Sequence, residues 1–179
     1  GGKVLTDKSI VCFDRLRPYF GDCLATMQAM KHLDLESKDG KAPGGFMYPL
    51  YEIGVPFIYM NAVGSQRDVV TMVHEGGHAI HSFLSRNLEM TEFKSTPSEV
   101  AELASMSMEL LSMDHWNIFY ANNNELKRAK LEQLEKALET LPWVASIDKF
   151  QHWIYTTKHT SKQREEKWLE ISAELGNQI

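Results

Sequence analysis

The segment His74-Glu75-Gly76-Gly77-His78 constrains this chain more than any other feature, because it lies inside a stretch that is expected to be helical. Ser65 stands three residues before Asp68, as in a capping box with Asp in place of the usual Glu or Gln, and an apolar run follows. We therefore predict a helix from Ser65 to about Leu88. Positions i and i+4 of a helix lie on the same side about one turn apart, so the two imidazoles can share one metal ion.

Glu75 lies between the two histidines but points away from their axis, where a carboxylate reaches a metal-bound water rather than the metal. Gly76 and Gly77 each cost a helix interior about 1 kcal/mol relative to alanine. This cost indicates that another part of the protein comes close to the helix, either a strand edge that holds a ligand or a second helix. Ordinary packing is the alternative explanation for the two glycines.

The sequence offers two candidates for a third metal ligand. A catalytic zinc ion usually has three protein ligands and one position for water. In the extended pattern His-Glu-x-x-His-x-x-Gly-x-x-His, a third histidine ligand would fall at position 84. This position is leucine, so a site of that pattern is excluded. A glutamate from the following helix is the other common solution, and Glu99 and Glu102 are available. Thr96 and Glu99 have capping-box spacing, so we assign Glu99 to the cap and prefer Glu102, one turn further on, as the ligand.

Outside this region, apolar periodicity predicts a mainly helical chain with one antiparallel hairpin. The hairpin strands are Phe46–Leu50 and Phe57–Met60, and they are the only strands that we predict. A length of 179 residues is typical of one globular domain, so we treat residues 1–179 as a single domain. The predicted helices other than the one that holds His74 cover residues 16–33, 96–120, 122–141, 142–155 and 161–175.

Composition and charge argue against several classes of function. The chain has 24 acidic and 19 basic residues, a net charge of -5, and no long block of one sign, which argues against nucleic-acid binding and against a polybasic membrane contact. No segment approaches the roughly 20 apolar residues that cross a bilayer, and no secretory signal is evident. The two cysteines, Cys12 and Cys23, form neither a disulfide framework nor a cysteine-rich zinc module. These features favour a cytoplasmic protein.

Two interpretations without catalysis are alternatives. A structural zinc ion usually has four ligands, commonly including cysteine, but no cysteine lies near His74 and His78, and Glu75 would have no role. A helical partner-binding domain without metal would leave the spacing of the two histidines unexplained. The alternative function is therefore a zinc-binding helical module that binds peptide or a partner without cleaving it.

Several stretches, in one order, resemble the thimet oligopeptidase and oligoendopeptidase F family of zinc metallopeptidases, nearer to oligoendopeptidase F. These stretches are residues 33–36, 40–46, 57–61, 74–81, 97–109 and 150–155. The resemblance implies an α-rich α+β fold, with a zincin-like helical core and a small antiparallel hairpin beside the HExxH helix. It implies one zinc ion on His74, His78 and Glu102, because the family's third ligand is a glutamate followed two residues on by Ala or Pro and then Ser. It also implies a zinc metalloendopeptidase that hydrolyses short oligopeptides.

In this interpretation, zinc activates a water molecule and polarises the scissile carbonyl, while Glu75 takes the proton of the water and passes it to the leaving amine. Either the strand from residue 57 to 61 or the strip from 44 to 46 would hold an extended peptide by backbone pairing. Glu99 and Glu109 are expected to contact the metal ligands rather than the metal. The expected peptide contacts are Gly44, Gly45, Phe46, Tyr59 and Asn61.

Family members are several times longer than this chain, so we expect a catalytic-core portion of a longer peptidase. The resemblance implies that a tyrosine and a histidine stabilise the oxyanion, and both would lie outside these 179 residues. Loss of one oxyanion donor commonly costs about 100- to 1,000-fold in rate. We therefore expect the isolated chain to bind zinc but to hydrolyse peptides poorly.

Overall fold

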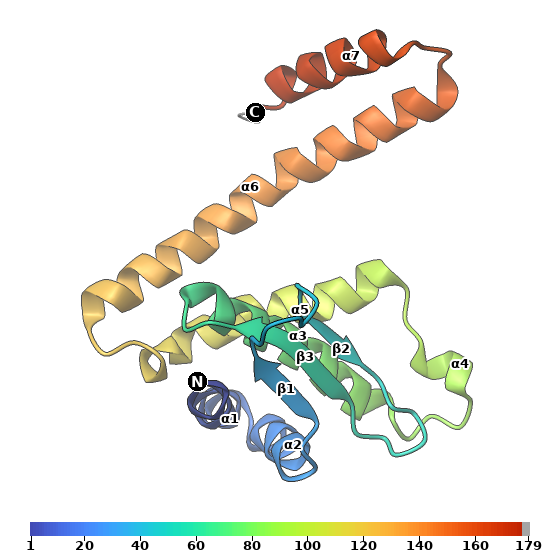
Figure 1. Ribbon diagram of the computed structural model, residues 1–179. Coiled ribbons are helices and arrows are strands. Elements are labelled where there is room, and N and C mark those ends of the chain that lie inside the picture. The colour runs from blue at the N-terminus through green and yellow to red at the C-terminus, as the bar shows by residue number, and fades with distance from the viewer. Residues whose placement is uncertain (177–179) are drawn as a thin grey trace. The chain divides into compact units, whose positions relative to one another are not determined.

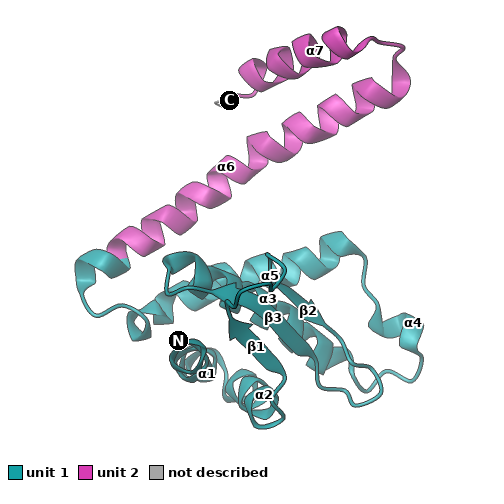
Figure 2. Ribbon diagram, viewed as in Figure 1, with its two compact units in different colours: residues 1–126 teal, residues 127–179 magenta. Residues whose placement is uncertain are grey.

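The computed structural model describes residues 1–176, and the chain divides into two compact units (Figures 1 and 2). The first unit covers residues 1–126 and the second begins at residue 127. Assignment of the whole chain to one domain stays a prediction. The elements are α1 (Gly2–Leu16), α2 (Pro18–Ala29), β1 (Leu33–Glu36), β2 (Phe46–Tyr48), β3 (Phe57–Ala62), α3 (Gln66–Ser85), α4 (Thr91–Lys94), α5 (Ser98–Ser112), the 3-10 helix η1 (Met113–Ile118), α6 (Asn123–Thr156) and α7 (Ser161–Glu174).

The first unit contains a three-stranded sheet with the order β1-β3-β2. The central strand β3 pairs antiparallel with β2, with Phe46 opposite Tyr59, so the predicted hairpin is confirmed. It also pairs in parallel with β1, which the sequence analysis missed because it placed Leu33 at the end of a helix. β1 has four residues, and its partner strand lies more than twenty residues further along the chain, so no local pattern revealed it. The predicted α-rich α+β fold is confirmed.

The N-terminal helices differ from the prediction of one helix over residues 16–33. The chain forms α1 and α2 with a break at Arg17, whose backbone is extended. Pro18 is the first residue of α2, where its missing N–H costs nothing and its fixed φ suits a helix start. The same ring restricts the preceding residue to extended conformations, which ends α1.

Helix α3 begins as predicted and carries the HExxH sequence. Ser65 is its N-cap in a capping box with Asp68. The Asp68 carboxylate accepts hydrogen bonds from the backbone N–H groups of Val63, Gly64 and Ser65, at 2.9, 2.6 and 2.8 Å. The helix contacts β2 and β3 on one side and α5 along its length. Its buried apolar residues include Met72, Val73, Ala79, Ile80 and Phe83.

The predicted capping box at the start of the next helix is wrong. Helix α5 begins at Ser98 with Pro97 as N-cap, and no side chain caps it. With Pro97 as N-cap, the N3 position of a capping box is Val100 rather than Glu99, and proline has no backbone N–H to donate. Glu99 is exposed. The helix also ends earlier than predicted, at Ser112, and η1 follows it.

The second unit consists of α7 and most of α6. We predicted two helices that meet at Pro142, but α6 is one helix of 34 residues with Pro142 inside it. Proline removes one backbone N–H donor from the helix and strains the preceding turn. The helical hydrogen bonds on either side can nevertheless keep the helix continuous. Helix α7 starts as predicted, with Thr160 and Gln163 in a capping box. No helix within residues 1–176 is both long and apolar enough to span a membrane.

Candidate metal centre

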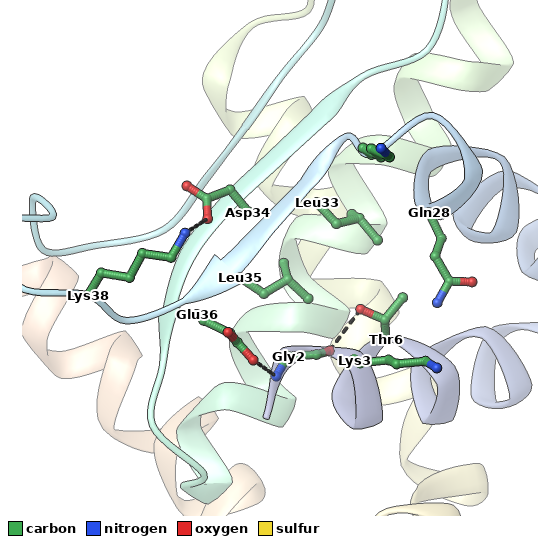
Figure 3. A pocket seen from close by; sticks show the side chains of 10 residues that line it. Gly2, Lys3, Thr6, Gln28, Leu33, Asp34, Leu35, Glu36 and Lys38 are labelled. Carbon is green, nitrogen blue, oxygen red and sulfur yellow. Dashed lines mark hydrogen bonds and ion pairs between the residues drawn. The ribbon is translucent and has the colours of Figure 1, made fainter.

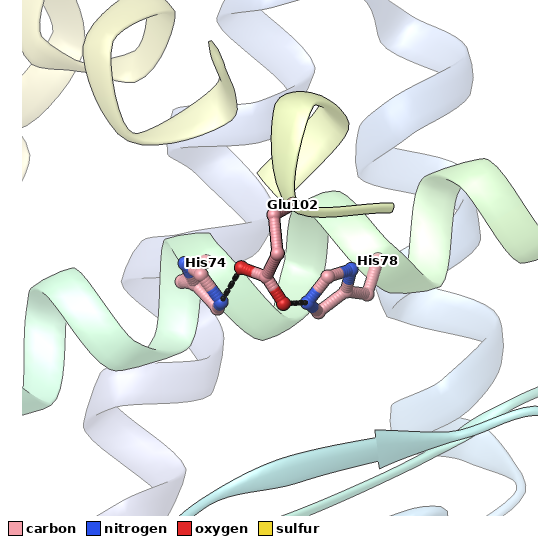
Figure 4. A group of neighbouring side chains, drawn as sticks. All are labelled: His74, His78 and Glu102. Carbon is pink, nitrogen blue, oxygen red and sulfur yellow. Dashed lines mark ion pairs between the residues drawn. The ribbon is translucent and has the colours of Figure 1, made fainter. Parts of the chain in front are cut away.

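The structure brings His74, His78 and Glu102 together between α3 and α5 (Figure 4). Nε2 of His74 lies 3.4 Å from Oε2 of Glu102, and Nε2 of His78 lies 3.6 Å from Oε1 of the same carboxylate. The two imidazole rings have centroids 4.9 Å apart and are nearly perpendicular, at 89°. One ligand atom from each of the three side chains lies within 4.8 Å of the others, so the three can converge on a single ion.

This donor set fits zinc. Zinc favours imidazole nitrogen and carboxylate oxygen in a tetrahedral arrangement. Ligand atoms at the usual zinc distances, about 2.0–2.1 Å, lie roughly 3.3 Å from one another in a tetrahedron. The observed 3.4 and 3.6 Å separations between the histidines and Glu102 are close to this value. Three protein ligands would leave a fourth position for water, as in catalytic rather than structural zinc sites.

Glu109, one of the two residues expected to support the ligands, contacts His74. Its Oε1 lies 2.5 Å from Nδ1 of His74. Burial lowers the pKa of His74, but the hydrogen bond to Glu109 and the nearby negative charge outweigh it, so the pKa lies above its ordinary value. A carboxylate on Nδ1 fixes the tautomer that leaves Nε2 free to bind a metal.

His78 is the more buried histidine of the pair, with 14% of its side chain exposed against 22% for His74. Burial and, next, the neighbouring His74 lower the pKa of His78, and the negative charge of Glu102 only partly offsets them. A lowered pKa keeps the imidazole neutral, which is the form that binds metal ions. Helix α5 therefore contacts both histidines through the Glu102 side chain, and His74 also through Glu109.

Glu75 is a buried acid, 7% exposed, on the side of α3 that faces the sheet. The backbone of Met47, the middle residue of β2, lies near its carboxylate. Burial raises the pKa of Glu75, and the charge of His74 and the nearby Met47 backbone only partly oppose it. The sequence analysis did not foresee Met47, because a backbone N–H leaves no trace in the sequence.

The two glycines of the motif are explained by close packing. A Cβ on Gly77 would lie 2.8 Å from the Ser105 Cα atom and 2.9 Å from the Met108 Cβ atom, both in α5. A Cβ on Gly76 would lie 2.6 Å from the Phe13 ring of α1. Of the two predicted causes, close approach of a second helix applies at Gly77. This approach brings Glu102 within reach of α3.

Ser105 is a second supporting residue that the sequence analysis missed. It is fully buried, and its hydroxyl lies 3.0 Å from the Glu102 carbonyl oxygen and 3.3 Å from Oε2 of Glu102. A single hydroxyl hydrogen donates to one of these oxygens at a time, and either bond restricts the position of the carboxylate. By contrast, Glu99 lies exposed near the start of α5, and the structure does not bring it to the three clustered side chains.

The five expected peptide contacts cluster around the loop that precedes β2. Tyr59 donates its hydroxyl to the Ala42 carbonyl at 2.7 Å, and Asn61 donates its amide to the carbonyls of Ala42 and Gly44 at 2.8 and 3.0 Å. The ring of Phe46 stacks on Tyr59, with centroids 4.9 Å apart. These polar groups are therefore used to hold the loop. The fifth residue, Gly45, packs against Thr71. A Cβ atom on Gly45 would lie only 3.0 Å from the Thr71 methyl group.

The sheet order corrects one of the two predicted peptide-binding strands. β3 is flanked by β1 and β2, so the backbone of residues 57–61 has no free edge for a further strand. β2 lies at an edge of the sheet and includes Phe46, the last residue of the other predicted strip. Only that strip is available for strand addition.

A separate pocket of about 330 Å³ opens beside β1 and α1 (Figure 3). Thr6, Gln28, Leu33, Asp34 and Glu36 are among its lining residues, and none of the predicted site residues contributes to it. His74, His78 and Glu102 therefore lie outside this pocket, between α3 and α5.

A helix with the HExxH sequence and a glutamate from the next helix is typical of metallopeptidases. Comparison with known proteins agrees with this class. The sequence model of peptidase family M3 matches residues 22–179, and this chain belongs to that family. The resemblance to oligoendopeptidase F is confirmed.

Two relatives show the degree of similarity. Oligopeptidase PepF of Bacillus subtilis (strain 168) is 29% identical over 128 residues, which cover 69% of this chain and 18% of the relative. An oligoendopeptidase F homolog of Mycoplasma pneumoniae is 38% identical over 85 residues, which cover 44% of this chain and 13% of the relative. The matched part therefore spans less than a fifth of either relative.

Solved structures share the fold over nearly the whole chain. A protein assigned as oligoendopeptidase F from Bacillus anthracis str. Ames superposes with a TM-score of 0.90 at 26% identity, and the match covers 98% of this chain and 32% of that protein. Pz peptidase A, solved with an inhibitor, gives a TM-score of 0.89 at 27% identity, with 98% and 31% covered. This chain thus corresponds to about a third of those proteins.

Proposed function

We propose that this chain carries the catalytic centre of a zinc-dependent endopeptidase that hydrolyses short oligopeptides. The observation that carries this proposal is the convergence of His74, His78 and Glu102 beside the buried carboxylate of Glu75. Membership of peptidase family M3 and the similarity to oligopeptidase PepF support peptides as substrates.

His74, His78 and Glu102 would hold the zinc ion, with Glu109 and Ser105 orienting two of these ligands. When bound, zinc supplies a Lewis acid that polarises a carbonyl oxygen and lowers the pKa of water to about 7. The nitrogen and oxygen donors and the three-residue count favour zinc in a catalytic role over a structural one.

Glu75 is proposed as the general base. Its carboxylate takes a proton from the attacking water and later delivers it to the nitrogen of the leaving amine. A raised pKa makes the carboxylate a stronger base, and burial, which raises it here, also excludes competing water. The backbone of Met47 in β2 lies near this carboxylate, so the base faces the edge strand.

The free edge of β2 is proposed to hold the peptide as an added strand. Because Met47 contacts Glu75, a peptide that pairs along this edge passes directly beside the base. Phe46 and Tyr48, which are 47% and 60% exposed, flank Met47 and can contact side chains of the peptide.

The test is cleavage of a short quenched-fluorescence peptide by the zinc-loaded peptidase in its full length, compared with Glu75→Gln. The variant should retain zinc, since Glu75 is not proposed as a ligand, and should lose roughly 100- to 10,000-fold in rate, the usual contribution of a general base. Equal cleavage by both proteins would contradict the proposal. Zinc and peptide binding without cleavage would favour the alternative, a peptide-binding module.

A further inference from the structure

We propose that Lys41 is a positioning residue that holds the loop at residues 42–45, and with it the edge strand β2, where the peptide substrate binds. The inference rests on the proposed peptidase function. It starts from a buried cation that the proposed chemistry does not use: the Lys41 side chain is 7% exposed.

The ammonium group of Lys41 is surrounded by oxygen atoms. It donates hydrogen bonds to the backbone carbonyls of Asp34 at 3.0 Å, Glu36 at 2.8 Å and Met60 at 2.6 Å. Oδ1 of Asp34 lies 3.2 Å from the same nitrogen. An ammonium group has three N–H donors and no acceptor, so three carbonyls match its full capacity.

These carbonyls belong to an irregular part of the sheet. The register between β1 and β3 shifts between Asp34 and Glu36. A shift of this kind leaves backbone groups without their usual partners in the ladder. Lys41 therefore takes the place of the missing N–H donors. Without it, these acceptors lose their partner, and the cost is largest at Met60, which is 2% exposed.

Lys41 also connects this irregularity to β2 through Tyr59. Its ammonium nitrogen lies 4.4 Å from the centroid of the Tyr59 ring. The same ring stacks on Phe46, the first residue of β2, and the Tyr59 hydroxyl bonds the Ala42 carbonyl. A continuous series of contacts thus runs from β1 and β3, through Lys41 and Tyr59, to the start of the edge strand.

Loss of Lys41 is expected to affect peptide binding rather than metal binding. β2 has three residues, and its position depends on the loop before it. The proposed zinc ligands lie on α3 and α5, which Lys41 does not contact through any of these bonds. Removal of Lys41 should therefore displace the peptide-binding edge while the metal site remains intact.

The experiment compares Lys41→Met with Lys38→Met in the full-length, zinc-loaded peptidase. Lys38 is the matched control, because it pairs with the same Asp34 at 3.5 Å (Figure 3) but is 65% exposed and lies in the same loop. Zinc content, kcat and KM are measured with a short quenched-fluorescence peptide, and amide hydrogen exchange is measured at residues 42–48.

Lys41→Met should keep its zinc, raise KM about tenfold and change kcat much less, since it removes binding rather than transition-state contacts. Its amides at residues 42–48 should exchange faster, and Lys38→Met should match the wild type in every measurement. Unchanged KM and unchanged exchange in a folded Lys41→Met protein would overturn the proposal. Absence of Glu75-dependent cleavage by the wild type would instead defeat the proposed function, and the exchange result would still test whether Lys41 holds the loop.

Lys41→Arg is the second variant in case Lys41→Met does not fold. It keeps the charge, but its donors are spread over a planar fork and cannot place one nitrogen among three carbonyls. KM should rise in this variant, by less than tenfold. A wild-type KM and wild-type exchange in folded Lys41→Arg would overturn the proposal.

Discussion

Glu109 and His74 are joined by a hydrogen bond between Oε1 and Nδ1, so the imidazole has only Nε2 available on the side of Glu102. The bond to Nδ1 leaves Nε2 as the ring nitrogen that can bind a metal. It also means that a residue on α5 that is not itself a proposed ligand should influence metal affinity.

Glu109→Gln should weaken zinc binding by roughly 10- to 100-fold, the usual effect of removing a partner of a metal-bound histidine. The measurement is a competition titration against a chelator of known zinc affinity. Glu99→Gln is the matched control, because it makes the same change at an exposed position of the same helix. Equal affinities in the two variants would show that Glu109 does not act on the metal.

Glu102→Ala should abolish stoichiometric zinc retention after dialysis, because it removes one of three proposed ligands. Glu99→Ala should retain zinc. It should also change the free energy of unfolding by less than about 0.5 kcal/mol, since an exposed residue without a capping role is being replaced. Zinc loss in Glu99→Ala alone would mean that the two glutamates had been assigned the wrong way round.

Gly77→Ala should weaken both stability and zinc binding. Alanine adds about 1 kcal/mol of helix propensity, but its Cβ would meet the Ser105 backbone at 2.8 Å and force α5 away. Overpacking of this kind costs about 1–3 kcal/mol, so the net effect on the free energy of unfolding should be destabilising.

Gly76→Ala is the comparison for Gly77→Ala, since its Cβ would meet the Phe13 ring of α1 rather than α5. Thermal unfolding should show a loss for both variants, and the zinc titration should show a larger loss for Gly77→Ala. Zinc affinity that falls equally in both would contradict a specific effect through α5.

Stability should depend on Asp34 in acid. Burial raises the pKa of Asp34, but the hydrogen bond and charge of Lys41, together with Lys38, outweigh it and hold the pKa below its ordinary value of 3.8. A carboxyl whose pKa is lower in the folded state stabilises the fold above its unfolded pKa, and this contribution is lost as pH falls through the folded pKa.

Asp34→Asn should therefore unfold more readily than the wild type at neutral pH, and the difference should shrink as pH falls below 3.8. Urea unfolding of both proteins across this range gives the measurement. A difference that stays constant, or that grows in acid, would show that the Asp34 charge is not the cause.

The sequence alone determined the features that depend on near neighbours. The capping box of Ser65 and Asp68 and the i, i+4 spacing of His74 and His78 involve residues within one or two turns of helix, so backbone geometry dictates their arrangement. The same holds for the hairpin of β2 and β3, whose strands are close in the chain. Local rules failed at two prolines. The helix break at Pro18 was not predicted, and a break was predicted at Pro142 although α6 continues through it.

Only the tertiary structure decided which groups meet across the fold. It brought the Met47 backbone near Glu75 and the Lys41 ammonium to carbonyls of two strands. Of the two glutamates expected to support the ligands, it placed Glu109 rather than Glu99 against His74. It also showed that Gly77 allows α5 to pack closely against α3 and that β1 is a third strand of the sheet. Apart from the bond between Lys41 and Asp34, these contacts join residues distant in the chain. All of them depend on backbone position and close packing, which single-sequence patterns do not encode.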